Sequence, residues 1–241
     1  MQKTSKSRLL MLAMCAILPS FLKRPVYRLF FGYKIGKRVR IGLTLLDAGE
    51  CSIDDDVSIG HFNVVTRVRK LVVKDHVRIG HLNIIRGGDE VSLGRYCEIM
   101  RMNEINSIPD PDVVNQIEPV FLLGDGSIVT TGHKIDFTDR VEIGRRVILG
   151  GRNSSLWTHN RQRTMPIRIG SLVYIGSEIR MAPGSTIPPR SIVGMGSVIT
   201  NELTEEGKLI AGVPAKMVKD LSDGDQFLIE RKTRPDLPDD V

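Results

Sequence analysis

The chain contains little cysteine, few aromatic residues and no acidic residue in its first forty positions. Its three cysteines, Cys15, Cys51 and Cys97, are far apart and form no C-x-x-C pair. They fit neither a disulfide framework nor a zinc knuckle, so we expect a reducing compartment. Aromatic residues make up 5% of the chain, whereas glycine occurs 23 times. This balance disfavours a sandwich rich in Tyr and Trp, and it favours a fold with many tight, regular turns.

The acid-free N-terminus accounts for the net charge of +6. Residues 1–40 contain ten Lys and Arg residues, whereas the remaining 201 residues contain 24 basic and 28 acidic ones. The body of the protein is therefore slightly acidic, and we expect no nucleic-acid partner.

The N-terminal apolar run is too short for an ordinary membrane span. Residues 9–22 form a run of 14 that includes Pro19, whereas a span needs about 20 residues. We favour a basic, apolar helical segment over residues 1–34 that lies in a membrane interface. The protein would then be cytoplasmic and would bind the inner face of the plasma membrane. A helix that caps the end of the domain is one alternative. A cleaved signal peptide is another, although no small-x-small cleavage site follows.

Aliphatic residues recur every six positions through most of the remaining chain. The period is unbroken at Ile169, Ile175, Met181, Ile187, Val193 and Ile199. It also runs, with shifts of phase, through residues 35–149. A period of six matches neither an amphipathic helix nor an alternating strand, but it suits a solenoid in which three short strands close one triangular coil. We therefore predict an all-β, left-handed parallel β-helix over residues 35–219, followed by a short tail at 220–241.

Two breaks in the period predict loops, at residues 101–121 and 152–166. The first contains three prolines, and the second contains Trp157 and His159. Long loops on a rigid repeat scaffold are common places for functional residues.

The repeat, the His-bearing loop and the sequence AGVPAK at Ala211–Lys216 resemble hexapeptide acyltransferases of the xenobiotic, maltose and galactoside acetyltransferase type. The resemblance covers roughly residues 35–219 and is closest to bacterial surface-polysaccharide O-acetyltransferases. It implies direct transfer of an acetyl group from acetyl-CoA to a hydroxyl of a bacterial saccharide, with no acyl-enzyme and no metal. It also implies a homotrimer, because the family's active sites lie between subunits.

The resemblance further assigns roles to residues of the loop region. His159 would be the general base, because an imidazole near its ordinary pKa can take a proton at neutral pH. His133 is a second candidate base, with a buried structural histidine as its alternative. Trp157, Asn160 and Asp136 are candidate acceptor-binding residues, although Trp157 equally suits packing of the loop onto the coils.

The resemblance also implies six residues at or near coil corners that would contact acetyl-CoA. Four of them would pass the pantetheine by main-chain contacts, and Arg190 and Lys216 are candidates for its phosphates. The six residues are Gly176, Ser177, Arg190, Gly194, Ser197 and Lys216.

Three other functions remain open. One is a zinc enzyme similar to γ-class carbonic anhydrases, because His61, His76 and His81 lie in the repeats; their spacing does not match that site, and the repeated Asn63 and Asn83 suggest a hydrogen-bonded ladder instead. A second is a non-catalytic β-helix scaffold. The third is an N-acetyltransferase that acts on an amino sugar nucleotide.

Overall fold

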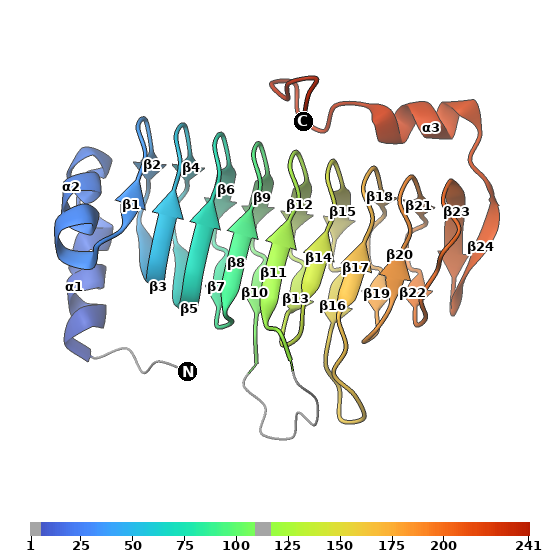
Figure 1. The fold of residues 1–241 in the computed structure, drawn as a ribbon, viewed down its shortest axis with the longest axis horizontal. Helices are drawn as coiled ribbons and strands as arrows, with labels where there is room; N and C mark the ends of the chain where they lie inside the picture. The colour runs from blue at the N-terminus through green and yellow to red at the C-terminus, as the bar shows by residue number, and fades with distance from the viewer. Residues whose placement is uncertain (1–5, 109–116) are drawn as a thin grey trace.

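The computed structural model describes residues 6–108 and 117–241 as a prism of stacked coils with two helices at one end (Figure 1). Each coil supplies one short strand to each of three faces, and strands of successive coils pair in parallel. Arg40 pairs with Ser58, and Tyr174 pairs with Ile192. These registers correspond to coils of eighteen residues, or three repeats of six. The predicted parallel β-helix is confirmed.

Two long strands, β3 (Thr44–Ile53) and β5 (Asn63–Val73), bend from the third face onto the first. The first face also contains β1 (Lys34–Ile35), β8 (Glu90–Leu93), β11 (Val120–Leu123), β14 (Val141–Ile143), β17 (Ile167–Ile169) and β20 (Thr186–Ile187). The third face also contains β7 (Ile84–Arg86), β10 (Glu104–Asn106), β13 (Lys134–Asp136), β16 (Ser155–Trp157), β19 (Arg180–Met181) and β22 (Val198–Ile199).

The second face is built from nine parallel strands and one antiparallel strand. The parallel strands are β2 (Arg40–Ile41), β4 (Ser58–Ile59), β6 (Arg78–His81), β9 (Glu98–Arg101), β12 (Ile128–Thr131), β15 (Ile148–Arg152), β18 (Tyr174–Ile175), β21 (Ile192–Val193) and β23 (Lys208–Gly212). The antiparallel strand β24 (Ala215–Asp220) closes the C-terminal end.

The inward side chains of the repeat fill the prism. Ile175 and Ile187 are fully buried. Cys51 and Cys97 are also buried, and burial raises the pKa of both thiols to about 12. At the corners, small residues let successive coils approach: a Cβ at Gly60 would collide with the backbone carbonyl of the next coil. In the six-residue pattern, the aliphatic positions therefore form the core and the small residues form the corners.

Buried polar side chains form a ladder along the edge between the second and third faces, which we call the ladder edge. Its members are Thr44, Asn63, Asn83, Asn103, His133 and Ser154. Asn83 donates from its backbone N and from Nδ2 to Oδ1 of Asn63, at 2.9 and 3.0 Å, and Asn103 repeats this pattern on Asn83. The predicted asparagine ladder is confirmed, and it satisfies polar groups that would otherwise be buried without partners.

The edge between the third and first faces, the loop edge, carries the long connections (Figure 1). Both are shorter than the sequence predicted, because β10 and β16 continue the coils inside the predicted loops. Ile105 and Leu156 fill inward positions of those strands and are fully buried. The first loop therefore spans residues 107–119 and the second 158–166; residues 109–116 of the first lie outside the described residues.

Helices α1 (Lys6–Ile17) and α2 (Ser20–Phe31) close the N-terminal end of the prism (Figure 1). Leu12 and Tyr27 are fully buried against the first coils, and Nζ of the buried Lys23 donates to the Ile41 carbonyl at 3.1 Å. The segment therefore caps the domain, as one of the predicted alternatives states. None of the helices in the described part of the chain is long and apolar enough to cross a membrane.

The C-terminal tail continues from α3 (Asp223–Glu230) back along the edge between the first and second faces, which we call the strap edge (Figure 1). Arg234, 3% exposed, donates from Nη1 to the carbonyls of His76 and Tyr96, both at 3.0 Å. Its Nη2 donates to Asp236 Oδ2 at 2.7 Å and holds the pKa of that carboxyl below its ordinary value. The tail is thus a strap fixed to several coils, which the sequence did not indicate.

We expect Arg234→Met to release the strap without unfolding the prism, because it leaves two buried carbonyls and one carboxylate without their donor. Hydrogen exchange of residues 231–241 should accelerate by about tenfold or more, while the coils keep their protection. Arg231→Met, at an exposed position of the same tail, is the control. Equal protection of the tail in both variants would contradict the role assigned to Arg234.

Candidate functional site

The loop at residues 158–166 is a short hairpin that presents His159. His159 pairs with Thr164 in an antiparallel bridge. At the tip, Oδ1 of Asn160 accepts a hydrogen bond from the backbone N of Gln162 at 2.8 Å. Hydrogen bonds within the hairpin therefore stabilise it, and the hairpin holds the half-buried His159 at a fixed place on the loop edge. The side-chain oxygen of Asn160, a residue predicted to bind the acceptor, is therefore used in this turn.

A buried polar network lies directly beneath the hairpin. Oγ1 of Thr158 lies 3.1 Å from the Asp136 carbonyl oxygen and 3.2 Å from Asp136 Oδ2, and it accepts from the backbone N of Asp139 at 3.0 Å. Asp136 Oδ1 accepts from Thr138 Oγ1 at 2.6 Å. All four residues are buried. Asp136 therefore positions the hairpin from below, and the structure does not support its predicted contact with the acceptor.

The same network anchors the base of the other long loop. The backbone N of Ile108 donates to Thr138 Oγ1 at 2.9 Å, and that of Glu118 donates to Asp139 Oδ1 at 3.1 Å. Glu118 also forms an ion pair with Arg140. Both loops thus rise from one network on the loop edge. The sequence analysis did not identify Thr138, Asp139 or Thr158. Their hydrogen bonds join two coils through side chains and follow no six-residue period.

His133 is a member of the polar ladder and is fully buried. Its Nδ1 accepts from the backbone N of Ser154 at 3.2 Å, and its Nε2 lies 2.9 Å from Thr130 Oγ1. Since Nδ1 accepts, Nε2 carries the proton of the neutral ring and donates to the hydroxyl. Burial lowers the pKa of His133 to about 4. This geometry fits the structural alternative and not an accessible base.

Trp157 ends β16, directly before the hairpin, and 40% of its side chain is exposed. It pairs in register with Asp136 on the third face. Part of the indole is therefore buried, and the rest faces solvent next to the segment that holds His159. Both predicted interpretations, packing of the loop and stacking on an acceptor, are compatible with this position.

The structure divides the candidate acetyl-CoA residues between two edges. The C-terminal end of the ladder edge brings together Gly176, Ser177, Gly194, Ser197 and Lys216. Coil stacking by itself explains the glycine at 176, because a Cβ there would lie 2.8 Å from the backbone N of Met195. The Ser197 hydroxyl turns inward and donates to the Gly194 carbonyl at 2.6 Å, which leaves only its main chain for a ligand.

Arg190 does not join that group. It lies on the strap edge, where its guanidinium is 2.6 Å from a carboxylate oxygen of Glu230 in α3. All corners of the prism have similar local sequences, so the sequence did not separate the edges. Within one chain, Arg190 is a partner of the strap.

Comparisons with known proteins agree with this architecture. No family profile matches the chain. The galactoside O-acetyltransferase of Escherichia coli (strain K12) is 36% identical over 63 residues, which are 26% of this chain and 30% of that protein. The chain spans less than half the length of the curated relatives it matches. The crystal structure of the polySia specific acetyltransferase NeuO superimposes with a TM-score of 0.51 at 17% identity, over 78% of this chain and 82% of that one.

The first of these comparisons matches part of the repeat sequence, and the second matches the coil architecture. A segment of the chain is similar in sequence to a galactoside O-acetyltransferase, and the coils share the fold of the polySia specific acetyltransferase NeuO.

The histidines of the zinc alternative are separated in this hexapeptide-repeat protein. His61 and His81 stack on the ladder edge with ring centroids 5.6 Å apart, and Nδ1 of His81 accepts from the backbone N of His61 at 3.0 Å. His76 stacks on Tyr96 at 4.5 Å on the strap edge. Across residues 6–108 and 117–241, no three His, Cys, Asp or Glu side chains converge as metal ligands.

Proposed function

We propose that this hexapeptide-repeat protein is an acetyl-CoA-dependent O-acetyltransferase that acts on a saccharide hydroxyl. The observation that carries the proposal is the hairpin, which presents His159 beside the partly exposed Trp157 on a rigid coil. The acetyltransferase name of the curated relative supports the reaction class. The galactoside and polysialic acid acceptors in the names of the two similar proteins support a sugar acceptor.

The proposed reaction is a direct transfer with His159 as general base. The imidazole takes the proton of the acceptor hydroxyl while the oxygen attacks the thioester carbonyl of acetyl-CoA. A C–O bond forms, the C–S bond breaks, and the leaving thiolate receives the proton from His159. Trp157 would stack on the apolar face of the sugar ring.

A homotrimer would complete the site. Within one chain, the hairpin lies on the loop edge, whereas Gly176, Ser177 and Lys216 lie on the ladder edge, at the opposite side of the third face. A second copy that places its ladder edge against the first copy's loop edge would bring acetyl-CoA to His159. Acetyl-CoA use and the free, buried cysteines agree with a cytoplasmic, reducing compartment.

Calorimetric titration of the purified protein with acetyl-CoA tests this proposal, combined with a thiol-release assay in which saccharides are the acceptors. We expect saturable binding and acceptor-dependent release of CoA. Absence of binding would favour the scaffold function and overturn the proposal. Release only with an amino sugar nucleotide would assign N-acetyl transfer instead.

A further inference from the structure

The outer surface of α1 and α2 is apolar and exposed, although these helices already bury one face on the coils. Leu10, Met14 and Ile17 recur at helical spacing on α1 and form a second apolar stripe, away from Leu12 and Cys15, which are buried. Side chains of this outer surface that are 61–79% exposed are Leu10, Met14, Ile17, Phe21, Leu29 and Phe30. We call these six residues the end patch.

The contacts of the inner face fix the end patch outward. Arg8 Nε donates to Asp47 Oδ1 at 3.0 Å, and Arg8 Nη2 donates to the Ala48 carbonyl at 2.9 Å. On α2, Tyr27 stacks on Tyr33 with ring centroids 5.6 Å apart. Rotating either helix to bury its outer stripe would break these buried polar and aromatic contacts. The exposure is therefore a consequence of the native packing.

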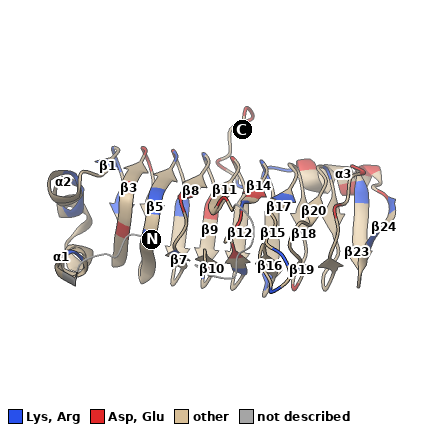
Figure 2. Cartoon of the chain, turned by 60° about the horizontal axis from the view of Figure 1, so that its bottom comes forward, with Lys and Arg blue, Asp and Glu red and all other residues tan. Residues whose placement is uncertain are grey.

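The helices that carry the end patch contain basic residues and no acidic ones. Figure 2 shows Lys and Arg, and no Asp or Glu, on α1 and α2. The exposed Lys34, Lys37 and Arg40 follow directly on the first coil. Apolar side chains within a basic, acid-free segment match the two layers of an anionic bilayer surface, its acyl boundary and its phosphates. A protein partner would instead have to present apolar and acidic groups together on one surface that matches the end patch and its basic neighbours.

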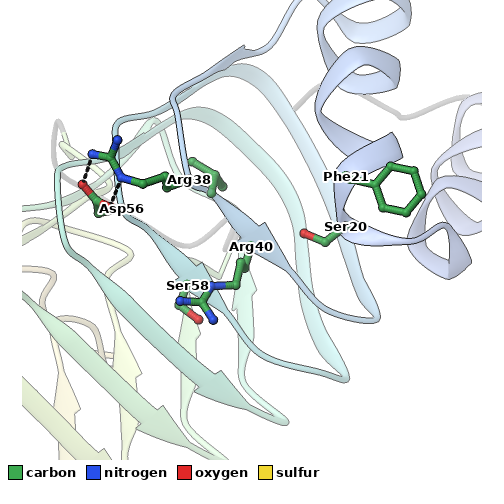
Figure 3. A pocket seen from close by; sticks show the side chains of 7 residues that line it. Ser20, Phe21, Arg38, Arg40, Asp56 and Ser58 are labelled. Carbon is green, nitrogen blue, oxygen red and sulfur yellow. Dashed lines mark hydrogen bonds and ion pairs between the residues drawn. The ribbon is translucent and has the colours of Figure 1, made fainter.

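A recess beside α2 offers a place for one such phosphate. It has a volume of about 540 Å³ and is lined by Ser20, Phe21, Arg38, Val39, Arg40, Asp56 and Ser58. Arg38 is held by Asp56 through two hydrogen bonds of 2.5 and 2.6 Å, whereas Arg40 lies on the wall next to Ser58 (Figure 3). Phe21, whose side chain is 75% exposed, lines the same recess, so an apolar end-patch residue stands beside the basic ones (Figure 3).

We propose that the end patch docks this protein onto an anionic phospholipid surface, with the apolar side chains at the acyl boundary and the recess over a headgroup phosphate. The inference does not depend on acetyl transfer. Docking by the end patch would also fix the distance between His159 and the membrane. On the third face, β3 of the first coils and β16 are five strand spacings apart. His159 would then stand about 24 Å from the capped end, at a height that suits the sugar part of a lipid-carried saccharide.

Vesicle flotation of the full chain tests the proposal. The probes are phosphatidylcholine vesicles with about 30% phosphatidylglycerol, compared with pure phosphatidylcholine. We expect the protein to float with the anionic vesicles, to float less with the neutral ones, and to lose binding as salt rises. Wild-type protein that stays out of the anionic vesicle fraction, whether as a monomer or as a self-associated oligomer, would overturn the proposal.

A matched pair of variants locates the binding surface. Leu29→Ser with Phe30→Ser changes two end-patch residues, and we expect its partition onto anionic vesicles to fall by about tenfold or more. Phe227→Ser with Leu228→Ser changes an adjacent exposed pair on α3, where Phe227 is 69% exposed, and should bind as the wild type does. Circular dichroism confirms that both variants are folded. Equal binding by the two variants, or equal loss in both, would contradict the end patch as the docking surface.

Discussion

Replacing His159 with alanine should lower kcat for acetyl transfer by about 100- to 10,000-fold while leaving acetyl-CoA binding near the wild-type level. The variant removes the group that takes the acceptor proton. It leaves the coils and the bridge between residues 159 and 164 in place, because that bridge is made by the backbone. The measurement is steady-state kinetics with varied acceptor, paired with calorimetric titration of acetyl-CoA.

Gln162→Ala is the matched control for this prediction. Gln162 is exposed at the tip of the same hairpin, and its backbone N, not its side chain, bonds Asn160. We expect it to keep kcat within about twofold of the wild type, as is usual for exposed substitutions. If both variants lost the same activity, the hairpin would act through its shape and His159 would not be the base.

Replacing His133 with asparagine should remove a pH dependence of stability. Burial holds the His133 pKa at about 4 in the folded state, against 6.5 for the free side chain. Between these values the unfolded chain binds the extra proton, so stability falls as pH drops from 6.5 toward 4. The wild type should lose about 2 kcal/mol of unfolding free energy through this residue between about pH 7 and about pH 4.5.

Asparagine is the suitable substitute because the ladder already uses it. Asn63, Asn83 and Asn103 occupy the equivalent corners, and their Oδ1 atoms accept a backbone N–H as His133 Nδ1 does from Ser154. The measurement is urea unfolding at the two pH values for wild type and variant. Gln162→Ala, which changes an exposed side chain without a titratable group, is the control and should keep the wild-type pH dependence.

Activity distinguishes the two interpretations of His133. A ladder residue can be replaced by asparagine with transferase activity retained near neutral pH, whereas a base cannot. Loss of activity in a folded His133→Asn protein that still binds acetyl-CoA would return His133 to the catalytic group. Retained activity with a flattened stability profile would support its place in the ladder.

Local sequence indicated the coils because each inward position needs one aliphatic residue, independently of the rest of the chain. The same property limited what it could say of the site. Corners on all three edges need small or turn-forming residues, so Arg190 on the strap edge and Gly176 on the ladder edge had the same signature. Likewise, the sequence analysis placed β10 and β16 in loops, because irregular residues follow each of these short strands directly. It therefore missed the inward positions of Asn103, Ile105 and Leu156.

By itself, the sequence determined the repeat, the core, the asparagine ladder and the segment that carries His159. These depend on contacts between neighbouring coils, which recur at a fixed spacing along the chain. Only the tertiary structure decided that Asp136 and Thr158 form one buried network under two loops, that Arg234 fixes the tail across distant coils, and that α1 and α2 leave an apolar surface exposed. Those features join residues through hydrogen bonds and packing whose spacing follows no period, so no local pattern records them.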